Sequence, residues 1–234
     1  MNLFQRCAAS FFILLAFSTP VLAIMMALGS AYPLRAEETR PEITIIAFGD
    51  SLTAGYLLNA REAFPAQLQM ALQGRGHKVQ VINAGVSGDT TAAGLERLSW
   101  ALETKADAVI LELGANDALR GLDPKEARAN LDKILTAIKA KGADVLIAGM
   151  KAPGNWGDDY AKEFDAIFPD LAKKYDAVLY PFFLEGVALQ SSMVMSDGLH
   201  PTAQGVAEIV KRILPEVEKL VERLSARKLS EGTR

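Results

Sequence analysis

The sequence has little cysteine, little histidine and little net charge. Its 234 residues include one cysteine, Cys7, so no internal disulfide can form. Two histidines and no cysteine pair give none of the ligand spacings of a zinc site, and neither a metal nor an organic cofactor is expected. The formal net charge is −3, which gives no electrostatic reason to expect a nucleic-acid partner.

Acidic residues are absent from the first 36 positions. In this stretch Arg6 precedes an apolar run over residues 11–28, a pattern typical of a secretory signal. We therefore predict that residues 1–36 are a signal peptide and that the protein is periplasmic or secreted. The run is also long enough for an uncleaved membrane anchor, and the sequence leaves this alternative open. Cleavage is expected after Ala23, Ala31 or Ala36.

Beyond residue 41 there is no internal repeat, low-complexity segment or linker. Short β-branched apolar runs alternate with amphipathic stretches, which predicts buried parallel strands joined by helices. The expected fold class is α/β: a three-layer α/β/α sandwich with a flavodoxin-like, doubly wound parallel sheet of about five strands, over residues 41–226. Residues 227–234 are expected to form a polar tail. The expected strands cover residues 43–48, 79–82, 108–113, 145–148 and 177–181. Helices are expected at 62–73, 91–103, 124–141, 158–175 and from about Thr202, the last kinked or ended by Pro215.

One of the two histidines lies where a serine hydrolase needs its base. His200 follows Asp197 by three residues, and Ser51 follows the first predicted strand. In a hydrolase, Asp197 would accept the Nδ1 proton of His200 and leave Nε2 facing Ser51 as nucleophile. The structural alternative is that Ser51 caps a helix while Asp197 and His200 form a turn and a helix entry. His77 lies in a polar stretch and is expected to be a solvated turn residue.

Acyl transfer also needs donors for an oxyanion. Three are available: the backbone N–H groups of Ser51 and Gly88, and the side-chain amide of Asn116. Each such donor typically lowers a barrier by roughly 2.7–4 kcal/mol. A glycine allows the backbone to approach the substrate closely. For Asn116 and the next residue, Asp117, a simple turn between strand and helix is the alternative.

Taken together, four segments resemble the conserved blocks of the SGNH (GDSL) hydrolase superfamily. They are Gly-Asp-Ser-Leu at 49–52, Asn-Ala-Gly-Val-Ser-Gly-Asp-Thr at 83–90, Leu-Gly-Ala-Asn-Asp at 113–117 and Asp-Gly-Leu-His-Pro at 197–201. The order and spacing also match, over essentially the whole chain from residue 43. Thr53 stands where the G-x-S-x-G elbow requires glycine, which disfavours an ordinary α/β-hydrolase.

The resemblance implies a serine esterase with nucleophile Ser51, Asp197 and His200 as its partners, and Gly88, rather than Gly85, and Asn116 as oxyanion donors. It is nearest to periplasmic esterases that act as thioesterase, arylesterase and lysophospholipase. It implies no metal and no cofactor, and as partners only a small acyl ester, thioester or lysophospholipid. Membrane contact is expected only through an uncleaved N-terminal segment, and the oligomeric state stays open. Asp50 is expected in the structural turn that holds Ser51. One departure from the family pattern is Ala115, which stands where relatives often have a second glycine.

Two loops are expected to border the substrate. The first, residues 117–124, contributes Asp117 and Leu119, and the second, residues 151–158, contributes Pro153 and Trp156. For Trp156 two interpretations stay open: it lines the site, or it packs on the domain. The alternative functions are an envelope polysaccharide deacetylase using the same residues, and a non-catalytic envelope binding protein.

Overall fold

The computed structural model describes residues 43–232, with side chains to residue 230. Five parallel strands form one sheet in the order β2-β1-β3-β4-β5. The predicted α/β fold with a doubly wound parallel sheet is confirmed. The order reverses between β1 and β3, and in such sheets a crevice opens beyond the carboxyl ends of the strands at this point. The strands are β1 (Ile43–Gly49), β2 (Val79–Gly85), β3 (Ala108–Glu112), β4 (Asp144–Ala148) and β5 (Val178–Tyr180).

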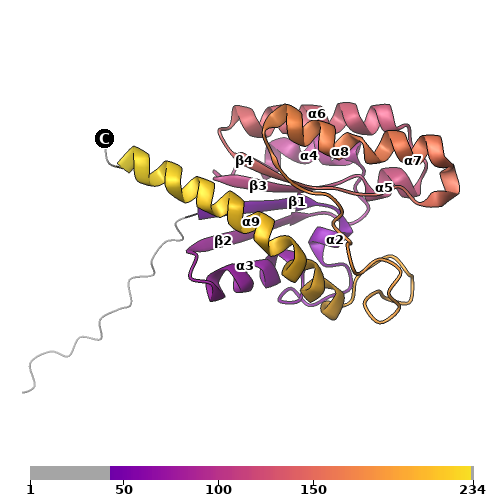
Figure 1. Ribbon diagram of the computed structural model, residues 1–234, viewed down its shortest axis with the longest axis horizontal. Helices are drawn as coiled ribbons and strands as arrows, with labels where there is room; N and C mark the ends of the chain where they lie inside the picture. The colour runs from indigo at the N-terminus through magenta and orange to yellow at the C-terminus, as the bar shows by residue number, and fades with distance from the viewer. Residues whose placement is uncertain (1–42, 233–234) are drawn as a thin grey trace, which may run out of the picture. The chain divides into compact units, whose positions relative to one another are not determined.

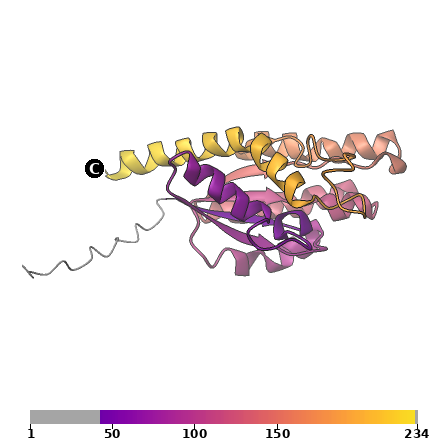
Figure 2. The ribbon, with the colours of Figure 1, turned by 90° about the horizontal axis from the view of Figure 1, so that it is seen from below.

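Helices cover both faces of the sheet. Figure 1 shows α4, α6 and α8 on one face, and α3 and α9 on the other; Figure 2 shows α9 running along that second face. The longer helices are α3 (Phe64–Gly74), α4 (Thr91–Ala101), α6 (Pro124–Ala140), α7 (Asp158–Asp165), α8 (Ile167–Tyr175) and α9 (Ala203–Gly232). Two short helices, α2 (Ser51–Ala54) and α5 (Ala115–Leu119), and a 3-10 turn, η1 (Gly154–Trp156), follow the strand ends.

The central strands are apolar because helices shield them on both sides. Every residue of β3 and β4 is buried, whereas the edge strand β2 exposes Gln80 and Asn83. This is the burial pattern expected of a parallel sheet with covered faces. Burial of this core is the main favourable contribution to folding. It also gives the loops at the strand ends a rigid base.

Two helices differ from the sequence-based prediction. The helix expected over 158–175 is divided at Ala166 into α7 and α8. Helix α9 continues through Pro215 to Gly232, so residues 227–232 are helical rather than a separate tail. Arg227 and Lys228 on this last part bind Asp144 and Asp107, at 3.0 and 2.9 Å. These contacts to the sheet end explain why the helix persists where its sequence turns polar.

The predicted signal peptide, residues 1–36, lies outside the described residues. Among residues 43–232, no helix has the length and apolar character that a membrane crossing requires.

Candidate active site

Ser51 is the first residue of helix α2, directly after the carboxyl end of β1. Asp50 caps this helix, since its Oδ1 accepts the backbone N–H of Leu52 at 2.9 Å. Gly55, with a φ of 81°, ends the helix after one turn. Ser51 is 8% exposed, so its hydroxyl is held in a tight, nearly buried turn. The sequence predicted a turn that holds Ser51, or a helix capped by Ser51; the structure has a one-turn helix in which Asp50 is the cap.

The structure brings Ser51, His200 and Asp197 into one chain of hydrogen bonds. Nε2 of His200 lies 2.9 Å from Ser51 Oγ, and Nδ1 lies 2.7 Å from Asp197 Oδ2. With the Nδ1 proton donated to the carboxylate, Nε2 is free to accept the Ser51 proton. This is the geometry that activates a hydroxyl nucleophile.

Asp197 is held in place by its own loop. Its Oδ1 accepts the backbone N–H groups of Leu199 and His200, at 2.9 and 3.0 Å. These bonds, with the ring of His200, lower the pKa of Asp197 to about 2, so the carboxylate is anionic throughout the physiological range. The turn and the ring contact, which the sequence offered as alternatives, therefore occur together. The ring of Tyr56 also packs on His200, with centroids 4.4 Å apart.

Besides the N–H of Ser51, the proposed oxyanion donors come from segments that follow β2 and β3. Gly88 adopts a φ of 88°, in the left-handed region that favours glycine, and its N–H lies in an exposed turn. Asn116, on α5, donates its Nδ2 to Asp50 Oδ2 at 3.1 Å and to the backbone oxygen of Asp89 at 2.9 Å. Its amide is thus fixed next to the residue that precedes Ser51.

A buried pair of carboxyl groups lies beneath Ser51. Asp50 and Glu112 are both 0% exposed, and Glu112 Oε2 accepts the Thr53 hydroxyl at 2.7 Å. Burial raises the pKa of Asp50 to about 6. Burial, and then the charge of Asp50, raise the pKa of Glu112 well above its usual value. Gly49 makes room for this arrangement, since a Cβ there would lie 2.5 Å from Glu112 Oε2.

A cavity of about 300 Å³ opens over Ser51 and His200. Its wall is mostly apolar, and Leu119 and Pro153 contribute to it, as predicted from the sequence. Apolar walls around a few polar groups are typical of a small-molecule site. The other lining residues are Asp50, Leu52, Ala115, Asn116, Ala118, Met150, Lys151, Ala152, Phe182, Leu184 and Leu199.

Comparison with known proteins identifies the family of this chain. The sequence pattern of the GDSL-like lipase/acylhydrolase family matches residues 47–207. The chain belongs to this family. It is accordingly a hydrolase of carboxylic esters.

Individual relatives agree with this assignment. The chain is 41% identical to an arylesterase of Vibrio mimicus, over 75% of this chain and 88% of the relative. It is 39% identical to thioesterase 1/protease 1/lysophospholipase L1 of Escherichia coli K12, over 76% and 85%. The crystal structure of AlinE4, an SGNH-hydrolase family esterase, is 50% identical, with a TM-score of 0.65 over 76% of this chain and 95% of that one.

Two of the predicted substrate-loop residues of this GDSL-family hydrolase do not line the cavity. Asp117 is buried and accepts the backbone N–H and the hydroxyl of Thr91, at 2.8 and 2.6 Å, so it ties α5 to the start of α4. Trp156 donates its Nε1 to the backbone oxygen of Ala118 at 2.8 Å and packs on Gly121. Both therefore support helix α5, which carries Leu119, rather than contact the cavity.

Sequence reasoning also missed residues of this region. Glu112 could have been noticed in the sequence, because it is an acidic residue at the end of an apolar strand. Nothing in the sequence pointed to Arg97, because its partners lie up to 48 residues away. His77, predicted as a solvated turn residue, is partly buried, with Nε2 3.3 Å from Glu218 on α9. Within residues 43–232, no three His, Cys, Asp or Glu side chains are grouped to hold a metal ion.

Proposed function

We propose that this protein hydrolyses acyl esters through an acyl-enzyme on Ser51. The observation that carries the proposal is the hydrogen-bonded chain from Ser51 through His200 to Asp197, at the wall of an apolar cavity. A capped helix start would explain Ser51 alone. It would not explain why an imidazole with a free Nε2 meets the hydroxyl at 2.9 Å.

In the first step Ser51 Oγ attacks the acyl carbonyl carbon while its proton passes to His200 Nε2. The carbonyl oxygen becomes an oxyanion, and the anionic Asp197 stabilises the imidazolium. As the intermediate collapses, His200 gives this proton to the leaving alcohol or thiol, which departs and leaves the acyl group on Ser51. A water molecule then attacks, with His200 as base again, and releases the acid.

Three donors serve the oxyanion in this proposal: the N–H groups of Ser51 and Gly88 and the amide of Asn116. In the ligand-free protein both Nδ2 bonds of Asn116 go to Asp50 and Asp89. An oxyanion beside Ser51 would share one of these hydrogens, and the 3.1 Å bond to Asp50 is the longer of the two. Asn116 then needs no rearrangement of its side chain to contribute.

The cavity is suited to small substrates with an apolar acyl group. Leu119, Pro153, Met150 and Leu184 offer no partner for a polar chain, and about 300 Å³ is a modest volume. We propose aryl and short-chain esters, thioesters and lysophospholipids as the substrate class. The similarity to an arylesterase and to a thioesterase/lysophospholipase supports this choice.

The test is a substrate panel with wild type and Ser51→Ala. We expect turnover of p-nitrophenyl butyrate, an acyl-thioester and a lysophospholipid by wild type, and no turnover by the variant with an unchanged melting temperature. His77 does not line the cavity and contacts Glu218 of α9, so His77→Ala is the matched control and should keep full activity. Turnover of acetylated polysaccharide alone would favour a deacetylase, and no turnover of any substrate would favour a binding protein.

We also propose that the protein is exported and acts in the periplasm or outside the cell. The support is the basic residue, the apolar run and the late first acidic residue in positions 1–37. N-terminal sequencing of the native protein should find a start between Ile24 and Glu37. An intact Met1 in the membrane fraction would favour the anchor instead, and an intact Met1 in the cytosol would exclude export.

A further inference from the structure

Arg97 on helix α4 binds three residues at the carboxyl ends of β1 and β2. Its Nη2 donates to the backbone oxygen of Gly49 and its Nη1 to that of Ala84, both at 2.9 Å. Its Nε donates to Asp89 Oδ2 at 2.5 Å. The guanidinium lies over the Phe48 ring, 4.2 Å from the centroid, and the side chain is 17% exposed. Each of the three guanidinium nitrogens therefore donates one hydrogen bond inside the domain.

Each of these acceptors adjoins a part of the proposed oxyanion hole. Gly49 precedes Asp50 and the nucleophile Ser51. Ala84 is the second-last residue of β2, in the segment that continues to Gly88. The backbone oxygen of Asp89 also accepts Asn116 Nδ2 at 2.9 Å. Arg97 thus bonds directly to the segments that carry the Ser51 and Gly88 donors, and it reaches the Asn116 donor through Asp89.

We propose that Arg97 is a positioning residue that sets the Gly88 and Asn116 donors relative to Ser51. The inference rests on the proposed function, because it assigns Arg97 a role in the same oxyanion site. Arg97 acts through Asp89 and the two carbonyl groups, and it does not touch the substrate cavity.

The chemistry of the contact favours arginine over lysine. A guanidinium is planar and presents several N–H donors in a fixed fork, so it holds three acceptors in defined directions. An ammonium group on a flexible stem would satisfy these acceptors only in part. Asp89 is 8% exposed, so its carboxylate needs a partner inside the domain. Misplacement of a catalytic group by about 1 Å can cost on the order of 10²-fold in rate.

The experiment measures kcat and KM for p-nitrophenyl butyrate in R97M and R97K. Each rate is divided by the concentration of active sites titrated with a fluorophosphonate, which removes any loss from misfolded protein. We expect R97M to lower kcat about 10- to 100-fold with KM changed less than about threefold, and R97K to fall between R97M and wild type. R128M, which removes the exposed Arg128–Asp170 pair on α6, is the matched control and should keep wild-type kcat.

A double-mutant cycle with N116A separates positioning from stability. If Arg97 acts on the oxyanion donors, the fold loss caused by R97M should be at least threefold smaller in the N116A background. The kcat of D89N/R97M should stay as low as that of R97M. Neutralising Asp89 does not restore the hydrogen bonds to the backbone oxygens of Gly49 and Ala84.

Three results would overturn the inference: an equal fold loss in both backgrounds, a loss that vanishes after active-site titration, or recovery of wild-type kcat in D89N/R97M. Failure of the proposed function is a different outcome, because wild type would then show no turnover or Ser51→Ala would keep it.

Discussion

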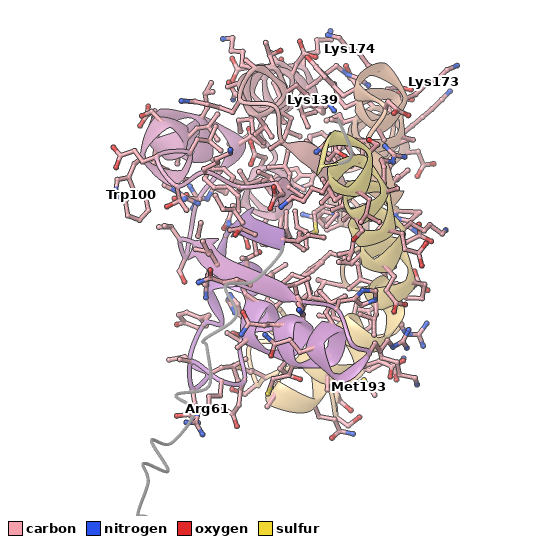
Figure 3. The ribbon with its side chains drawn as sticks, turned by 90° about the vertical axis from the view of Figure 1, so that its left-hand side faces the viewer. Arg61, Trp100, Lys139, Lys173, Lys174 and Met193 are labelled. Atoms are coloured by element: carbon pink, nitrogen blue, oxygen red, sulfur yellow. The ribbon has the colours of Figure 1, made fainter. Side chains whose placement is uncertain are left out.

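Acidic side chains lie at both ends of the parallel sheet, in contrasting surroundings. At the amino ends of the strands, Asp107 binds Lys228 at 2.9 Å and Asp144 binds Arg227 at 3.0 Å. Figure 3 looks at the domain from this end, with Lys139, which lies 3.9 Å from Asp144, in view. At the carboxyl ends, Asp50, Glu112 and Asp117 are buried. In the described part of the chain, no Lys or Arg lies within ion-pair distance of them.

The difference shows that the fold keeps its destabilising, buried carboxyl groups at the candidate active site. Cations of α9 stabilise the carboxylates at the amino ends of the strands. At the site, Asp50, Glu112 and Asp117 have no paired Lys or Arg in the described part of the chain, and burial raises the pKa of all three. Strongly shifted carboxyl groups cluster at functional sites more often than elsewhere. Only Asp197, on an exposed loop, has a lowered pKa at the site end.

The largest effect is expected at this exposed carboxylate. Asp197→Asn removes the acceptor that fixes the ring tautomer of His200, and kcat should fall by about 10⁴. Steady-state kinetics at pH 7 to 8 with p-nitrophenyl butyrate measures this. Asp170→Asn, an exposed carboxylate paired with Arg128, is the control. A loss below tenfold for Asp197→Asn would mean that the Asp197–His200 bond is only structural.

The next effect concerns the oxyanion. Asn116→Ala should lower kcat by about 10²–10³ with little change in KM, because the amide acts chiefly in the transition state. Asn130→Ala is a suitable control, since its amide binds the Thr91 hydroxyl away from the cavity. A change confined to KM would show that Asn116 positions substrate instead.

A smaller effect is expected at the cavity wall. Leu119→Ala should reduce kcat/KM for octanoyl esters about 3- to 10-fold relative to acetyl esters, because part of the apolar contact with a longer chain is lost. The measurement is a chain-length series from acetyl to octanoyl. Leu229→Ala, exposed at the far end of α9, should leave the series unchanged. An equal loss for all chain lengths would remove Leu119 from the acyl site.

The smallest effects are on stability, and they test the two sheet ends directly. The raised pKa of Glu112 means that the folded state keeps a proton that the unfolded state releases above about pH 4.3. Stability from this group therefore decreases as pH rises from about 4. Glu112→Gln removes that dependence, so its melting temperature should improve relative to wild type between pH 5 and pH 8.

Asp107→Asn makes the matching change at the opposite end. It loses the ion pair with Lys228, so it should lower stability by about 1 kcal/mol or less at pH 7. That corresponds to a melting temperature lower by about 2–4 °C or less, and the loss should shrink at high salt. Thermal unfolding at several pH values and salt concentrations measures both variants. Equal behaviour of Glu112→Gln and Asp107→Asn would contradict the contrast between the two ends.

Sequence patterns predicted the sheet well because its strands are apolar throughout and local periodicity carries that signal. The short helices α2 and α5 were not expected, since four or five residues show no periodicity. Ser51, Asp197 and His200 could be proposed because histidine is so scarce. Asp117 was wrongly assigned to the cavity, since its partner Thr91 lies 26 residues away. The contacts of Arg97 and the raised pKa of Glu112 depend on packing between strands and helices, which one sequence does not display.

The most direct test is the site of covalent modification. We predict that a fluorophosphonate labels the wild-type protein once, that peptide mass spectrometry places the adduct on Ser51, and that hydrolysis stops in proportion to labelling. Ser51→Ala should take no label, and His200→Ala should react far more slowly. A label on another residue, or full hydrolysis by a protein fully labelled at Ser51, would contradict the acyl-enzyme account.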